Sequence, residues 1–270
     1  SMITYRKIGT TLLVVLLAAG LQACANPEQV IMDSAMQGMQ RAAGEHVEHA
    51  VYGAFAPDEP APSPNRGRQW NQYMVTHAQT VFAHSFSVGG YWISRAEFQP
   101  GEWAEYEIDQ AGNDQVVRVE KAFLKRTADG NEWWRVRWSV DDEKTWIYES
   151  LIDRERGQLL RLRGQDQEGN VKEIPVEKGT RVYRAPREMT AESIEGATVG
   201  TTTVQTRAGS FEADEVHYGA MGAQGDVVFW LNDGIPGGVV KYQISNNQGA
   251  QWTSTLVDYG SNATTQLESY

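Results

Sequence analysis

The 270-residue sequence is acidic, with 35 Asp and Glu against 24 Lys and Arg and a formal net charge of −11. A negative field of this size repels phosphate backbones and anionic lipid headgroups, so nucleic acid is excluded as an expected partner. A single cysteine excludes an internal disulfide, and the nine Trp and eleven Tyr supply ample material for a core.

Residues 1–23 have the three-part layout of a secretory signal peptide. Arg6 and Lys7 precede an uninterrupted apolar run at 12–19, and small neutral residues lead into Cys24. The run is shorter than the ~20 residues that a transmembrane helix needs. The layout therefore predicts that residues 1–23 are removed.

Leu21-Gln-Ala-Cys24 resembles the bacterial lipobox, in which the cysteine receives diacylglycerol, with acyl chains such as palmitate, before cleavage. The resemblance implies a membrane partner, reached through lipid on Cys24. Ala25 in place of Asp favours the outer membrane, facing the periplasm, by the enterobacterial sorting pattern. The alternative is an ordinary secreted chain with an incidental cysteine.

Residues 24–55 are expected to form a lipid-anchored amphipathic helix, because apolar residues recur every three or four positions. Met32, Met36 and Met39 begin this stripe and are candidates for docking on a partner, another copy or the membrane; the alternative is packing against the chain's own sheet. Residues 56–68 follow, a Pro-rich stretch that favours an extended, semi-rigid linker.

A second amphipathic helix is predicted over 70–88. Its apolar positions fall at i, i+3, i+4, i+7, i+8, i+11 and i+12, namely Trp70, Tyr73, Met74, His77, Ala78, Val81 and Phe82. Gly89-Gly90 then ends the helix. So broad an aromatic face is expected to lie on an apolar surface.

From Gly101 onward the period changes to two, and strands alternate with turn residues. The pattern predicts eleven strands, at 103–108, 115–126, 132–140, 145–152, 158–164, 171–176, 199–206, 211–219, 225–231, 238–245 and 250–258. A helical turn is expected at 191–194. The short connections predict antiparallel neighbours.

The two faces of the strands differ. In the strand 132–140, Trp134, Val136, Trp138 and Val140 alternate with Trp133, Arg135, Arg137 and Ser139. One face is therefore expected to be apolar and the other polar, unlike a strand buried on both sides. The fold class predicted is mainly β, a curled antiparallel sheet in residues 69–270 whose apolar face the helix at 70–88 covers.

Three phrases carry a resemblance to a known fold. They are Gly101-Glu-Trp-Ala-Glu-Tyr106, the hairpin from Gly200 to Phe211, and Phe229–Tyr242 with its Pro236-Gly-Gly turn. Together with the sheet, the helix and the lipobox, they resemble the LolA/LolB-like half-barrel of bacterial outer-membrane lipoprotein-sorting proteins. The phrases themselves read as turn devices and argue for fold rather than chemistry.

The resemblance implies a concave face that shelters an apolar ligand such as an acyl chain. Candidate lining residues are Trp70, Met74, Val81, Phe82, Trp134, Trp138 and Trp230. The alternative is that the same residues form a packed core without a cavity, and both readings stay open.

The sequence predicts no enzyme, no cofactor and no metal site. His46 and His49 have a spacing that can hold a metal, but no third ligand converges on them, and a polar helix face is the simpler interpretation. Nucleophile elbow, phosphate-loop and zinc-protease motifs are absent from the sequence.

The function predicted is that of a lipid-anchored envelope lipoprotein that binds an apolar ligand or a lipid-modified partner without chemical turnover. A scaffold subunit of an envelope assembly is the alternative, supported by the methionine stripe, and a hydrolase ranks last.

Overall fold

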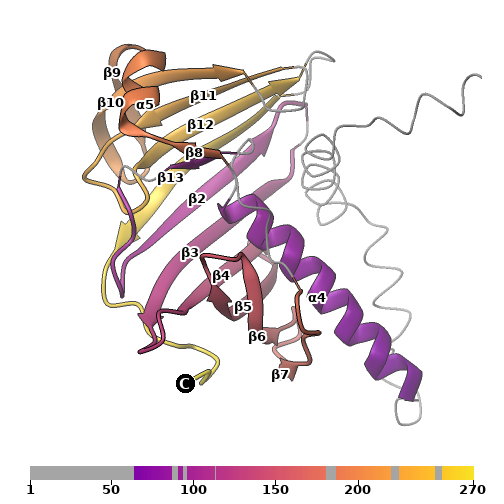
Figure 1. Ribbon diagram of the computed structural model, residues 1–270. Coiled ribbons are helices and arrows are strands. Elements are labelled where there is room, and N and C mark those ends of the chain that lie inside the picture. The colour runs from indigo at the N-terminus through magenta and orange to yellow at the C-terminus, as the bar shows by residue number, and fades with distance from the viewer. Residues whose placement is uncertain are drawn as a thin grey trace, which may run out of the picture.

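The computed structural model describes residues 64–86, 91–93, 96–112, 114–180, 187–219, 225–246 and 251–270. In these ranges the chain is mainly β, with one large antiparallel sheet, a small parallel pair and two helices (Figure 1). None of the helices in these ranges is long and apolar enough to span a membrane.

The large sheet contains the eleven strands that the sequence predicts, each boundary within two residues of the predicted one. They are β2 (Trp103–Gln110), β3 (Val116–Arg126), β4 (Glu132–Val140), β5 (Lys144–Asp153), β6 (Gln158–Gln165), β7 (Val171–Ile174), β9 (Thr198–Thr206), β10 (Gly209–Gly219), β11 (Gly225–Leu231), β12 (Val239–Asn246) and β13 (Gln251–Gly260).

The chain builds this sheet as two meanders that join at its centre. The strand order is β7-β6-β5-β4-β3-β2-β13-β12-β11-β10-β9, so the first and last strands of the sheet's sequence, β2 and β13, pair in the middle. β7 and β9 form opposite edges and do not pair, so the sheet stays open. Every pairing within it is antiparallel, as the short connections predict.

Turn residues act as the sequence indicates. Asp141 and Asp142 link β4 to β5 with φ angles of 50° and 57°, a left-handed conformation that Asp tolerates better than most residues. The Asp141 carboxylate also accepts a hydrogen bond of 2.9 Å from the Val116 amide, which ties this turn to β3.

Helix α4 (Pro64–Phe86) packs against β4 and β7, in the half of the sheet formed by the first meander (Figure 1). Its buried residues repeat at the predicted spacing, and they are Trp70, Met74, His77, Ala78, Val81, Phe82 and Phe86. Gly164 on β6 makes room for it, because a Cβ there would lie 2.9 Å from the Met74 methyl group. That α4 covers the whole apolar face stays a prediction.

The helix begins at Pro64, inside the segment 56–68 that was predicted as a linker. Proline suits the first turn of a helix, where its missing amide hydrogen has no partner to lose. Residues 56–63 lie outside the described part of the chain. So do Cys24, the predicted helix at 24–55 with Met32, Met36 and Met39, and His46 and His49.

The expectation of a polar, uncovered second face is wrong at β4 and β5. Trp133 and Arg135 are only 3% and 5% exposed, because the segment 261–270 lies over them. The Arg135 guanidinium donates to the Thr264 carbonyl at 2.5 Å, and the rings of Trp133 and Tyr270 lie 5.7 Å apart. Both faces of β4 are therefore buried except at Arg137, which is exposed.

Glu149 on β5 fixes that segment. Its carboxylate is fully buried and accepts hydrogen bonds of 2.6 Å from the hydroxyl groups of Thr265 and Ser269 and from the Gln266 amide. Three donors satisfy a carboxylate that would otherwise be costly to bury. Strand periodicity alone does not reveal this cover, since it depends on residues more than 100 positions away.

Two smaller elements complete the fold. Helix α5 (Ala191–Ala197) extends the predicted helical turn, and the Thr190 hydroxyl caps it by accepting from the Ser193 amide at 3.1 Å. The parallel pair of β1 (Tyr91–Ile93) and β8 (Arg187–Met189) was not predicted, because three-residue strands carry too little periodicity.

Candidate functional site

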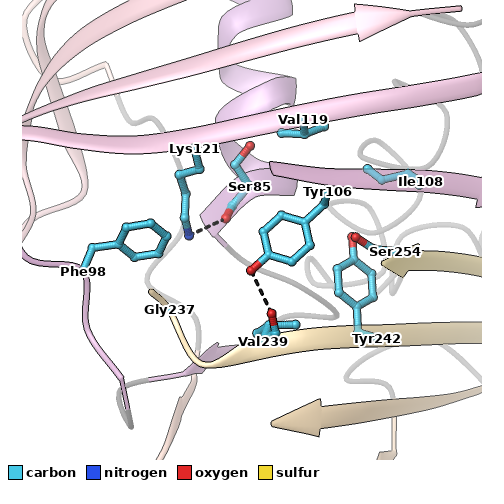
Figure 2. A pocket seen from close by; sticks show the side chains of 10 residues that line it. All are labelled: Ser85, Phe98, Tyr106, Ile108, Val119, Lys121, Gly237, Val239, Tyr242 and Ser254. Carbon is cyan, nitrogen blue, oxygen red and sulfur yellow. Dashed lines mark hydrogen bonds between the residues drawn. The ribbon is translucent and has the colours of Figure 1, made fainter. Parts of the chain in front are cut away.

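A pocket of about 60 Å³ lies on the apolar face of the large sheet (Figure 2). Its walls come from the central strands β3, β2, β13 and β12, from the last turn of α4 and from two connecting segments. The lining residues are Ser85, Phe98, Tyr106, Ile108, Val119, Lys121, Gly237, Val239, Tyr242 and Ser254. The volume is several times the ~15 Å³ that holds one water molecule, so a small organic group fits.

Strand alternation explains why these side chains converge. On β3, Val117, Val119, Lys121 and Phe123 share the inner face, and on β2 the inner face carries Tyr106 and Ile108. Antiparallel pairing sets Tyr106 opposite Val119 and Ile108 opposite Val117. Lys121 is therefore a cation placed at a position that the pattern reserves for an apolar residue.

The Lys121 ammonium group lies among aromatic rings at one side of the pocket. Nζ is 4.7 Å from the ring centroid of Phe86 and 4.9 Å from that of Phe98, and it donates to the Ser85 carbonyl at 3.0 Å (Figure 2). Burial, with a smaller effect of the nearby Arg154 charge, lowers the pKa of Lys121 from 10.5 to about 7. Burying the charged form of Lys121 therefore costs folding free energy.

Two tyrosines form the opposite wall. The Tyr106 hydroxyl donates to the Val239 carbonyl at 2.9 Å (Figure 2). Tyr242 shares a hydrogen bond with Ser254. Burial raises the pKa of both phenols, so both remain neutral at physiological pH. None of the ten lining residues is acidic, and the walls therefore carry no negative charge of their own.

The Pro236-Gly-Gly turn shapes the pocket as well as the hairpin. Gly237 adopts φ of 79°, and its amide donates to the Ala96 carbonyl at 2.7 Å, which docks the segment 96–100 on the turn. A Cβ at Gly237 would overlap the ring of Phe98. Gly237, which the sequence indicates as a turn residue, is thus also needed because Phe98, which lines the pocket, packs directly against its backbone.

Six of the seven residues predicted to bind an apolar ligand belong to the packed core. Trp70, Met74, Val81, Phe82, Trp134 and Trp138 are each no more than 5% exposed. Trp134 comes nearest to the pocket, since its ring contacts Phe86 and Phe98 and lies 5.8 Å from Lys121 Nζ. The seventh, Trp230, is half-buried beneath the Lys241 ammonium group at 4.7 Å. Their ligand-binding role stays a prediction.

Sequence reasoning missed Lys121, Tyr106 and Phe98. The signal for Lys121 was present, because it interrupts the apolar alternation Val117, Val119, Phe123 on one face. Phe98 offered no such signal, since it lies in a segment without periodicity and reaches the pocket through Gly237.

His77 is the buried histidine of α4 and forms part of a separate polar cluster. Nδ1 lies 2.6 Å from the Tyr148 hydroxyl, and the ring stacks against Tyr73 at 5.7 Å. Burial lowers the pKa of His77 from 6.5 to about 4, so the ring is neutral at pH 7. Through these contacts the cluster packs α4 against β5.

The remaining histidine with a described side chain, His217, lies on the surface beside Glu215, with 2.7 Å between Nε2 and the carboxylate. Among the described residues, no group of three His, Cys, Asp or Glu side chains has a geometry that could hold a metal. What the site offers chemically is an apolar wall, neutral hydroxyl groups and one amine.

No protein-family model matches the sequence, and no curated protein matches it. Solved structures of similar fold include a chain of the Pseudomonas aeruginosa MucA/MucB complex, at 12% identity and a TM-score of 0.40, which covers 70% of this chain and 60% of that one. The chain thus spans less than two thirds of the length of that neighbour.

Two further solved structures are similar to this chain. A candidate lipoprotein from Parabacteroides distasonis matches at 10% identity, 62% and 98% coverage and a TM-score of 0.29. A candidate outer membrane lipoprotein-sorting domain from Vibrio parahaemolyticus matches at 12% identity, 65% and 90% coverage and a TM-score of 0.27.

Proposed function

We propose that this protein is a bacterial envelope lipoprotein that binds an apolar ligand in the pocket of Figure 2 without chemical turnover. The observation that carries the proposal is the pocket itself, set in the apolar face and walled by Ile108, Val119 and Phe98. Concave, mostly apolar pockets with a few converging polar groups are the usual form of small-molecule sites.

The predicted anchor gives this binding a location. Lipid on Cys24 would hold the chain at the outer membrane, and the Pro-rich stretch would set the domain off the bilayer. Tethering raises the domain's effective concentration near membrane lipids. A Cys24→Ser variant is expected to remain unprocessed; normal cleavage with unchanged membrane association would contradict the lipobox assignment.

A scaffold role is the second candidate, and the packing of the predicted ligand-binding residues favours it. Residues such as Phe82 and Trp138 are fully enclosed and leave no space of their own for a ligand. A scaffold would bind an envelope partner through another surface, and the stripe of Met32, Met36 and Met39 is the predicted one.

Mass spectrometry of molecules extracted from the purified chain tests the two functions. Val119→Phe adds a ring inside the pocket, and Val199→Phe makes the same change on β9, where Val199 is 63% exposed. We expect the wild type and Val199→Phe to release apolar molecules and Val119→Phe to release on the order of tenfold less.

Direct titration with 1-decanol, followed by NMR, supplies the second measurement. If the wild type releases no apolar molecule and does not bind decanol, the ligand-binding function is refuted and the scaffold function remains. Equal release from both variants would place the ligand elsewhere on the chain.

A further inference from the structure

We propose that the pocket selects an amphiphile with a single anionic headgroup, carboxylate or phosphate, and that Lys121 is its countercharge. The inference rests on the apolar binding function proposed above and adds the chemistry of the headgroup. Three features of the described residues support it: the position of the lysine, the charge of its surroundings and the aliphatic surface in the walls.

The position of Lys121 is that of a site residue rather than a surface lysine. It projects from the inner face of β3 between Val119 and Phe123, and Figure 2 shows Nζ in the pocket between Phe98 and Ser85. Lys241 on β12 differs from it. Its ammonium group lies over the Trp230 ring, and Lys241 is not among the residues that line the pocket, although other residues of β12 are. A long cationic side chain normally reaches toward water.

The net charge of −11 repels anions at long range, but the charges closest to Lys121 favour an anion that has entered the pocket. Arg154 adds a second positive charge nearby, although it also pairs with Glu97 at 2.9 Å and with Glu132 at 3.6 Å. The phenols of Tyr106 and Tyr242 are neutral. An anion beside Nζ would offset the free-energy cost of burying the ammonium group, and the low dielectric of the pocket would strengthen the attraction between the two charges.

The walls also offer aliphatic surface for a carbon chain. Lys121 and the Ser85 carbonyl lie at one side of the pocket, and Ile108, Val119 and Val239 contribute aliphatic side chains, alongside the neutral hydroxyl groups of the opposite wall. A volume of about 60 Å³ accepts a headgroup with a few carbon atoms, and the rest of a longer chain would extend from the pocket's open side. Lysine acts as a point charge and suits carboxylate and phosphate alike.

The test compares decanoate, monodecyl phosphate and 1-decanol, which share one chain and differ in the headgroup. Titrations at pH 6.5 use the wild type, Lys121→Met and the matched control Lys241→Met. We expect the wild type and Lys241→Met to bind one or both anions on the order of tenfold more tightly than decanol. In Lys121→Met this preference is expected to disappear while decanol binding persists.

The ratio of anion to decanol affinity is a readout that a purely structural role of Lys121 would not move. A second readout is the NMR titration of the Lys121 side chain, whose pKa is expected to rise when the anion binds, because the charged form gains a partner. The phosphate and carboxylate arms identify which headgroup fits.

The outcomes separate the two proposals. Equal binding of anions and decanol by the wild type refutes the headgroup inference and leaves apolar binding intact. An anion preference that survives in Lys121→Met refutes the role of Lys121. If none of the three molecules binds, the proposed function fails as well.

Discussion

Replacing Lys121 by methionine is expected to make the protein more stable at pH 7. The pKa of this lysine falls from 10.5 in the unfolded chain to about 7 in the folded one, mainly because the ammonium is buried. Each pKa unit corresponds to about 1.4 kcal/mol, so the charged lysine lowers the free energy of unfolding by about 4 kcal/mol at pH 7.

Two effects reduce the expected gain. Lys121 is partly exposed, so solvent screens some of the burial cost. The methionine also loses the contacts of the ammonium with the rings of Phe86 and Phe98 and with the Ser85 carbonyl. Subtracting about 1–2 kcal/mol for these contacts leaves an expected stabilisation of about 2 kcal/mol.

The pH dependence has a defined sign. The folded pKa lies below the unfolded one, so between pH 7 and pH 10.5 the unfolded chain binds more protons, and raising the pH stabilises the wild type. The advantage of Lys121→Met is therefore greatest at pH 7 and below, and it shrinks to less than ~1 kcal/mol by pH 10.

Urea denaturation at pH 7 and pH 10 measures this difference, with Lys241→Met as the control. The control removes the same charge from the surface and is expected to change stability by less than ~1 kcal/mol at both values. If Lys121→Met is less stable than the wild type at pH 7, or if its advantage does not depend on pH, the burial cost assigned to Lys121 is wrong.

Two further predictions concern α4 and the Gly237 turn. The pKa of His77 is lowered from 6.5 to about 4 in the folded protein. The contribution of neutral His77 to the free energy of unfolding should therefore be fully present above pH 6.5 and fall by about 3 kcal/mol toward pH 4. Denaturation curves of His77→Phe should lack this loss. Gly237→Ala should lower the free energy of unfolding by roughly 2–4 kcal/mol, because a Cβ strains a positive φ and overlaps Phe98. In the same denaturation experiments the control Gly130→Ala, with φ of 84° and open space around it, should lower it by only about 1 kcal/mol. Equal losses in the two variants would refute the close approach of Phe98 to Gly237 as the cause.

Alternation and turn chemistry were sufficient to predict the eleven strands and their antiparallel neighbours, but not the pairing of β2 with β13 at the centre of the sheet. Most of the strands alternate apolar and polar residues, and Asp or Gly stands where the chain reverses, as at Asp141 and Gly209. Those signals are local, so one sequence reveals them. The short pair β1 and β8 was missed because three residues carry almost no pattern.

The cover over β4 could not be read from its sequence. Trp133 and Arg135 alternate with apolar residues as the exposed face of a strand would, but the segment 261–270 covers them. That contact depends on a tertiary partner, the Glu149 carboxylate, which bonds residues more than 100 positions along the chain. Burial on the second face is a property of the whole chain rather than of the strand.

The pocket could be predicted from the sequence only in part, less well than the strands and better than the cover over β4. Its walls join Phe98, Lys121 and Gly237, which are far apart in sequence and meet only because β2 and β13 pair at the centre of the sheet. The aromatic residues that drew attention in the sequence fill the core instead. Large apolar side chains are the strongest signal in a sequence, but they usually fill the packed core rather than line a pocket.

A residue that breaks the local pattern is therefore the better guide to function. Lys121 replaces an apolar side chain on the inner face of β3, and its buried charge reduces stability at neutral pH. Valine or methionine at that position would satisfy the strand pattern and the core. Departures of this kind are expected where a site requires them, and a ligand that brings a negative charge would convert the cost into affinity.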